Sequence, residues 1–155
     1  MTALSLVFTL GLAASGPMPQ GTAPSDSIEF RLEDHRWTHR LLFVFAPSRD
    51  AASYVEQVKR VAGTQGGFRE RDLLLIEVMA DGPSRVSTDT LSAASEQRLR
   101  DRFDVPPSAF RVVLVGKDGT EKRRDETPVT APSIFETIDA MPMRQREMRE
   151  DDGGG

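Results

Sequence analysis

Residues 41–78 read LLFVFAPSRDAASYVEQVKRVAGTQGGFRERDLLLIEV, and this stretch decides the fold. Its two ends, 41–46 and 73–78, are continuous apolar runs with the length and composition of buried strands. Between them, apolar residues recur at the spacing of a helix: Ala51, Tyr54, Val55, Val58, Val61 and Ala62. A strand, a helix and a second strand in this order form a βαβ unit, so we predict that the two strands are parallel.

The second half of the chain predicts two more strands and two more helices. Strong helix formers fill 92–104, and the apolar run at 110–115 is typical of a strand. The sequence GKDG at 116–119 predicts a hairpin turn into an antiparallel strand at 120–124. A last helix begins after Thr130, and Pro142 is expected to break or kink it. The order β-α-β-α-β-β-α predicts a thioredoxin-like α/β fold, with a four-stranded mixed sheet flanked by helices.

The two ends of the chain are predicted to lie outside this domain. The apolar run at 4–14 is too short to span a bilayer and has the length of the apolar core of a signal peptide. No Lys or Arg precedes it, so a short helix or strand in the core is the alternative. We predict a signal peptide over 1–15, a flexible linker over 16–27, the domain over 28–149 and a disordered tail over 150–155. A secreted or periplasmic protein without a transmembrane segment follows from this division.

Charge and cysteine content exclude several classes of function. The chain has 20 Lys and Arg against 24 Asp and Glu, which gives a net charge of −4. Specific nucleic-acid binding is not expected from a mildly acidic chain, because such binding depends on neutralising phosphates. The sequence contains no cysteine, which excludes disulfides, zinc–thiolate sites, iron–sulfur clusters and thiol catalysis.

Four segments carry a resemblance to a known family: WTHRLLFVFAP at 37–47, RERDL at 69–73, FRVVLVGKDG at 110–119 and IDAMPMRQ at 138–145. Through them, residues 37–149 resemble the peroxiredoxin-like domain of unknown function called DUDES. That domain occurs in small secreted bacterial proteins and as repeats in animal extracellular-matrix and sushi-repeat proteins. The resemblance implies a thioredoxin-like fold without an established activity.

The turn after the first predicted strand is where thioredoxins and peroxiredoxins carry the reactive cysteine. Here it consists of Pro47, Ser48, Arg49 and Asp50, which we call the redox-site turn and interpret as vestigial. A serine hydroxyl does not ionise near neutral pH without an adjacent base, and Ala109 stands near the position of the cis-proline of redox-active members. We therefore predict a redox-inactive domain without catalytic residues or a cofactor. A residual activity that uses no thiol, in an oxidoreductase-related protein, is the alternative.

The same turn leads into a helix whose first amides lack partners within the helix, and such amides attract anions. Two states are possible for these amides. Either they are open to an external anion, which Arg49 would also attract, or Ser48 or Asp50 caps them.

His35 and His39 allow two interpretations, a metal site or a purely structural role. Two imidazoles four residues apart on a helix can bind one metal ion, with Glu33 or Asp34 as a further ligand. The pattern of zinc proteases requires Glu directly after the first His, where this chain has Arg36. The alternative is a polar approach to the first strand with Trp37 docked on the core, and we predict no metal site.

Two segments are candidates for binding a partner. The predicted hairpin carries the basic residues Lys117, Lys122, Arg123 and Arg124, and the segment after Pro142 carries Met143, Arg144 and Arg146. The alternatives are a solvated sheet edge, which charged residues protect, and a helix folded over the sheet. We predict a binding module for an unknown protein or an anionic surface.

Overall fold

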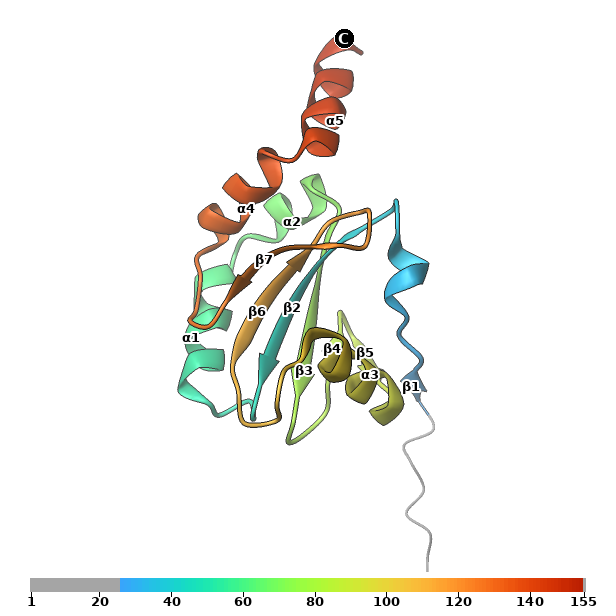
Figure 1. The fold of residues 1–155 in the computed structure, drawn as a ribbon. Coiled ribbons are helices and arrows are strands. Elements are labelled where there is room, and N and C mark those ends of the chain that lie inside the picture. Colours follow the sequence, from blue (N-terminus) through green and yellow to red (C-terminus); the bar gives the residue numbers. More distant parts are fainter. Residues whose placement is uncertain (1–25, 155) are drawn as a thin grey trace, which may run out of the picture.

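The computed structural model describes residues 26–154. Its strands form one mixed sheet of seven, in the order β1-β5-β4-β3-β2-β6-β7 (Figure 1). In its centre, β2 (Arg40–Ala46) and β3 (Leu73–Met79) run parallel. On the other side of β2, the antiparallel strand β6 (Arg111–Val115) forms a hairpin with β7 (Glu121–Asp125). These are the four strands that the sequence predicts.

The prediction of a four-stranded sheet is wrong, because three short strands extend the sheet beyond β3. They are β4 (Arg85–Val86), β5 (Asp89–Leu91) and β1 (Ser27–Ile28), which pair in turn with β3, β4 and β5. Each has only 2 or 3 residues, too few for the alternation of apolar and polar side chains that predicts a strand. Backbone pairing, and not a side-chain pattern, therefore builds this edge.

Helices cover both faces of the sheet (Figure 1). One face carries α1 (Ala52–Val61), α2 (Gln65–Glu70) and α4 (Ala131–Asp139), and the other carries α3 (Ala93–Phe103) and the short 3₁₀ helix η1 (Leu32–His35). Tyr54 and Ile134 pack on the first face, and Leu99 and Phe103 pack on the second. Every residue of β2 is buried, and the residues of β3 are buried or partly buried, as continuous apolar runs indicate.

The last helix, α5 (Pro142–Gly153), points away from the sheet (Figure 1). It begins at Pro142 after α4 has ended at Asp139, so the predicted break is confirmed. Residues 150–153 are helical where we predicted a disordered tail, because the run of Arg, Gln and Glu before them favours a helix. Arg144 is the one buried residue in the described part of α5. None of the helices within residues 26–154 is both long and apolar enough to cross a bilayer.

Candidate functional site

The redox-site turn joins β2 to α1. One of its residues, Arg49, bonds to side chains of α1 and β3. Arg49 donates hydrogen bonds to the Tyr54 hydroxyl at 2.8 Å and to the Pro83 carbonyl at 3.1 Å. Its guanidinium lies 3.5 Å from the Glu77 carboxylate, which also accepts a hydrogen bond from the Tyr54 hydroxyl. Arg49, Tyr54 and Glu77 thus form a closed group at the redox-site turn.

Tyr54 is poorly suited to proton transfer in this environment. Its burial, followed by its hydrogen bond to Glu77, raises the pKa of Tyr54 to about 12. A general acid or base works best with a pKa near the operating pH. The hydroxyl therefore serves as a constant donor to Glu77.

The helix that follows the redox-site turn has no side-chain cap. Ala51 is the N-cap residue of α1, and its N–H donates to the Ser48 carbonyl at 3.3 Å. Neither the Ser48 hydroxyl nor the Asp50 carboxylate bonds the first amides of α1, so of the two states left open by the sequence, the one in which Ser48 or Asp50 caps the helix is not formed. An anion site at these amides remains a prediction.

A buried arginine bonds to the carboxyl ends of the central strands from the other face of the sheet. The sequence did not predict its burial. Arg100 of α3 is 5% exposed and donates to the carbonyls of Ala46 and Val78, each at 3.2 Å. Those carbonyls lie near the carboxyl ends of β2 and β3. Burial lowers the pKa of Arg100, and nearby Glu96 opposes this effect only in part. Because charged residues surround Arg100 in the sequence, no pattern indicated that it faces the core.

His35 and His39 lie side by side, with ring centroids 5.6 Å apart. His35 also stacks on Phe30 at 4.8 Å, and its burial lowers the pKa of His35. Across residues 26–154, no group of three His, Cys, Asp or Glu side chains is arranged to hold a metal ion. Trp37 is 64% exposed, so the expectation that it docks on the core is wrong. Its backbone is left-handed (φ 68°), and its N–H donates to the Lys117 carbonyl at 2.6 Å.

The four cations of the β6–β7 hairpin do not form a free basic patch. Each has partners within the chain: Lys117 bonds to Asp72 and Glu147, Lys122 to Asp118, Arg123 to Asp125 and Ser133, and Arg124 to Glu121 and the Phe103 carbonyl. Arg123 and Arg124 thereby fasten β7 to α4 and to the end of α3. These contacts are internal, so the two arginines contribute to the fold.

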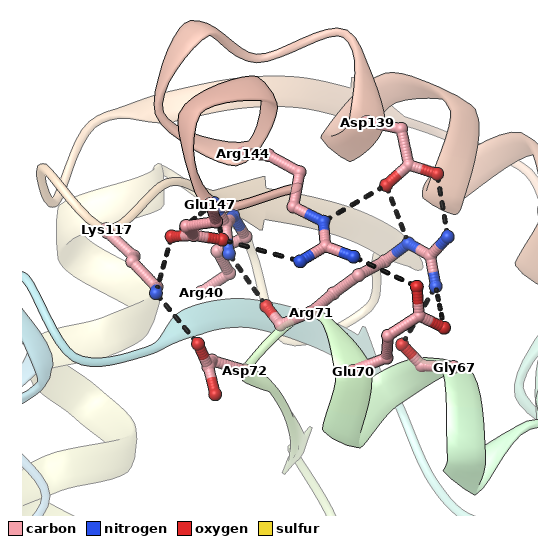
Figure 2. Close-up of polar contacts among 9 residues, drawn as sticks. All are labelled: Arg40, Gly67, Glu70, Arg71, Asp72, Lys117, Asp139, Arg144 and Glu147. Carbon is pink, nitrogen blue, oxygen red and sulfur yellow. Dashed lines mark hydrogen bonds and ion pairs between the residues drawn. The ribbon is translucent and has the colours of Figure 1, made fainter. Parts of the chain in front are cut away.

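Arg144 is also paired within the chain, and it is buried, whereas we predicted it on the surface (Figure 2). Its side chain is 4% exposed and bonds to Glu70 at 2.9 Å and to Asp139 at 3.4 Å. Asp139 in turn bonds to Arg71 at 2.7 Å. Arg144 therefore anchors the first turn of α5 to α2 and α4.

Glu147 makes the second anchor of α5 (Figure 2). Its carboxylate accepts hydrogen bonds from Arg40 at 3.2 Å and from Lys117 at 2.7 Å, and Lys117 also bonds to Asp72 at 2.8 Å. Burial opposes ionisation, but Lys117 and Arg40 outweigh it and hold the pKa of Glu147 below its usual range. We call the eight charged side chains of Figure 2 the ion network; its four cations are Arg40, Arg71, Lys117 and Arg144, and its four anions are Glu70, Asp72, Asp139 and Glu147.

A cavity of about 490 Å³ opens beside the ion network, between the β6–β7 hairpin and the start of α5. Its charged lining consists of Arg40, Lys117, Asp118, Lys122 and Arg146, and its apolar lining of Ala140, Met141, Pro142 and Met143. Arg146 is exposed and has no ion-pair partner among residues 26–154. The cavity thus brings together candidates from both predicted segments, Lys117 and Lys122 with Met143 and Arg146.

Residues 31–147 match the model of a protein family described as Domain of unknown function (DUF4174). The chain belongs to this family. It is 29% identical over 114 residues to Sushi repeat-containing protein SRPX2 of Xenopus laevis, a match that covers 72% of the chain and 25% of that protein. It is also 29% identical over 145 residues to Sushi repeat-containing protein SRPX of Rattus norvegicus, covering 88% of the chain and 31% of that protein. The resemblance to a domain shared with sushi-repeat proteins is therefore confirmed, although the chain spans less than a third of these relatives.

The solved structures that resemble this DUF4174 domain include peroxiredoxins. A reduced 2-Cys peroxiredoxin of Plasmodium vivax superposes with a TM-score of 0.56 at 15% identity, over 74% of this chain and 84% of the peroxiredoxin. Identity this low shows the fold alone. The thioredoxin-like α/β fold is confirmed in this respect, with the seven-stranded sheet as the correction.

Proposed function

We propose that this DUF4174 domain is a non-catalytic binding module that holds an acidic segment of another protein in the cavity at the start of α5. The observation that supports this most is the lining of the cavity, which combines cations with an apolar junction between α4 and α5. A carboxylate of the partner would pair with Arg146, the exposed cavity cation without an ion-pair partner among residues 26–154. Apolar side chains of the same partner would contact Met141 and Met143, whose flexible thioethers adapt to irregular surfaces.

The local charge balance favours a protein segment over a uniform polyanion. Lys122 is paired with Asp118, and Lys117 is paired with Asp72 and Glu147. A polyanion gains affinity by neutralising many unpaired cations, whereas here most cations already have partners. The apolar lining must therefore contribute, and a segment that alternates acidic and apolar side chains satisfies both parts of the cavity.

The redox-site turn supports the non-catalytic part of the proposal. The sequence lacks cysteine, and Arg49, Tyr54 and Glu77 bond to one another beside the position of the missing thiol. We expect peroxide consumption by the purified chain to equal that of a control without protein. Clear turnover would favour the alternative, a residual oxidoreductase-related activity that uses no thiol.

We further propose that the protein is exported to the periplasm or the medium. The apolar run at 4–14 and the resemblance to secreted domains support this, although the run lies outside the described residues. The mature protein should begin near Gly16, which N-terminal sequencing of the exported fraction measures. Protein that retains Met1 and stays in the cytoplasm would contradict export.

A short fluorescent peptide that alternates glutamate and leucine tests the binding function. Fluorescence anisotropy should show saturable binding to the full chain, and the affinity should fall as salt rises. Arg146→Glu reverses a cavity cation that has no internal ion-pair partner, so we expect about tenfold weaker binding, or about 1.4 kcal/mol. Arg149→Glu makes the same change at an exposed arginine of α5 outside the cavity lining, and it should leave the affinity nearly unchanged.

A polyglutamate peptide and dextran sulfate serve as competing probes. Both should bind more weakly than the alternating peptide, because neither can use the apolar lining. Tighter binding of either one would identify a polyanion site instead. Equal effects of the two arginine variants would place the peptide away from the cavity.

A further inference from the structure

We infer that Glu147 occupies, from within the chain, a carboxylate site that an acidic partner takes over, so that binding in the cavity releases the Glu147 anchor of α5. This inference rests on the proposed function and identifies the deepest part of the binding site. The group recognised there is a carboxylate of an acidic peptide.

The contacts of Glu147 show that the site is built for a carboxylate. Arg40 is 1% exposed, and its guanidinium bonds to both carboxylate oxygens of Glu147 at 3.2 Å. Lys117 bonds to the same carboxylate at 2.7 Å, and Arg144 lies 3.6 Å away. Both bonds come from the single Nη2 atom of Arg40, so one buried guanidinium nitrogen and two further cations surround one carboxylate, and such charge-assisted contacts bind an anion strongly.

Two of these cations are shared between Glu147 and the cavity. Arg40 and Lys117 both line the cavity, so a carboxylate that enters it approaches the groups that now hold Glu147. The Nε atom of Arg40 is buried and has no hydrogen-bond partner within the described residues. The guanidinium of Arg40 thus has spare hydrogen-bonding capacity, and an incoming carboxylate in the cavity would compete with Glu147 for Arg40 and Lys117.

The helix that carries Glu147 is held mainly by charge. Arg144 is the one buried residue in the described part of α5, and the helix points away from the sheet (Figure 1). Release of Glu147 therefore breaks ion pairs without exposing an apolar core. An incoming carboxylate restores the pairs with Arg40 and Lys117, so the exchange costs little. The bonds of Arg144 to Glu70 and Asp139 keep the first turn of α5 attached.

Glu147→Gln tests this exchange with the alternating glutamate–leucine peptide. The substitution removes the competing charge while preserving the size of the side chain, so we expect the peptide to bind at least about fivefold more tightly than to the unmodified chain. Glu150→Gln is the matched control, because Glu150 is an exposed acid of the same helix outside the ion network. It should leave the affinity unchanged.

Hydrogen exchange of the unmodified chain gives a second, independent measurement if Glu147→Gln does not fold. Peptide binding should accelerate exchange of the amides in 147–153 and leave those of β2 unchanged. Unchanged or slower exchange, or unchanged or weaker peptide binding by Glu147→Gln, would overturn the inference. If Arg146→Glu still weakens binding in that case, the proposed function stands and only the exchange fails. A peptide that does not bind at all would reject both.

Discussion

The two ends of the central parallel strands differ in what closes them. At the carboxyl ends of β2 and β3, Arg49 and Arg100 bond to backbone carbonyls within the body of the domain. At the amino end of β2, Arg40 bonds to Glu147 of α5, a helix whose other anchor is the buried Arg144. The first end is closed by arginine bonds to the main chain, whereas the second is closed by an ion pair beside a cavity. In this domain, the end that carries the redox-site turn is therefore not the end at which we propose binding.

We expect the largest loss of stability from Arg40→Ala. This substitution tests whether the structure at the amino end of β2 depends on its buried cation. Arg40 also donates to the Arg71 carbonyl at 2.8 Å. Arg40→Ala removes this donor from the Arg71 carbonyl, takes the buried cation away from Glu147 and opens a cavity where the long side chain lay, so the free energy of unfolding should fall by about 3–5 kcal/mol. Urea unfolding followed by circular dichroism measures this, and Arg40→Lys should recover part of the loss. A loss below about 1 kcal/mol, typical of exposed pairs, would show that the ion network does not stabilise this end.

A smaller loss is expected at the carboxyl end from Arg100→Met. Methionine fills similar space but removes the charged donor from the carbonyls of Ala46 and Val78, and only Ala46 is known to keep another donor, the Ala80 N–H. We therefore expect a loss of about 2 kcal/mol in the free energy of unfolding. Arg98→Met is the control in the same helix, because the side chain of Arg98 is 49% exposed and its loss should cost less than about 1 kcal/mol. Equal unfolding energies for the two variants would mean that Arg100 does not close this end.

Acid should weaken the amino end. Burial opposes ionisation of Asp139, but Arg71 and Arg144 outweigh it, so the pKa of Asp139, like that of Glu147, lies below its usual range. A carboxylate whose pKa is lowered by folding stabilises the folded state at pH values above its ordinary pKa. This contribution is lost as the pH falls through the pKa of the folded state. Urea unfolding over a pH series should therefore show declining stability below about pH 4.5. Glu147→Gln should flatten this decline, and an identical decline in the variant would contradict the assignment.

The smallest effect concerns the closed group at the carboxyl end. Tyr54 is the single tyrosine of the chain, so ultraviolet absorption of tyrosinate titrates this residue alone. The midpoint should lie at a pKa of about 12, and Glu77→Gln should lower it because one of its causes is removed. Circular dichroism at each pH verifies that the chain is folded. A midpoint near the ordinary value of 10.0 would show that Tyr54 is open to solvent.

The sequence predicts the centre of the fold better than its edge or its charges. The apolar runs of β2, β3 and β6 are visible because burial on both faces requires continuous apolar residues. The short strand β4 is not visible, because its formation depends on pairing with β3. Arg144 was assigned to the surface because it belongs to a polar segment, whereas its burial depends on Glu70, a residue far away in the sequence. Charge patterns show which residues are basic, but the tertiary structure decides which of them are already paired.

The outward position of Trp37 has a consequence for spectroscopy. It is the single tryptophan, and its indole is already largely in water in the native state, so its emission wavelength should change little when the chain unfolds. Intrinsic fluorescence is therefore a poor probe of stability for this protein.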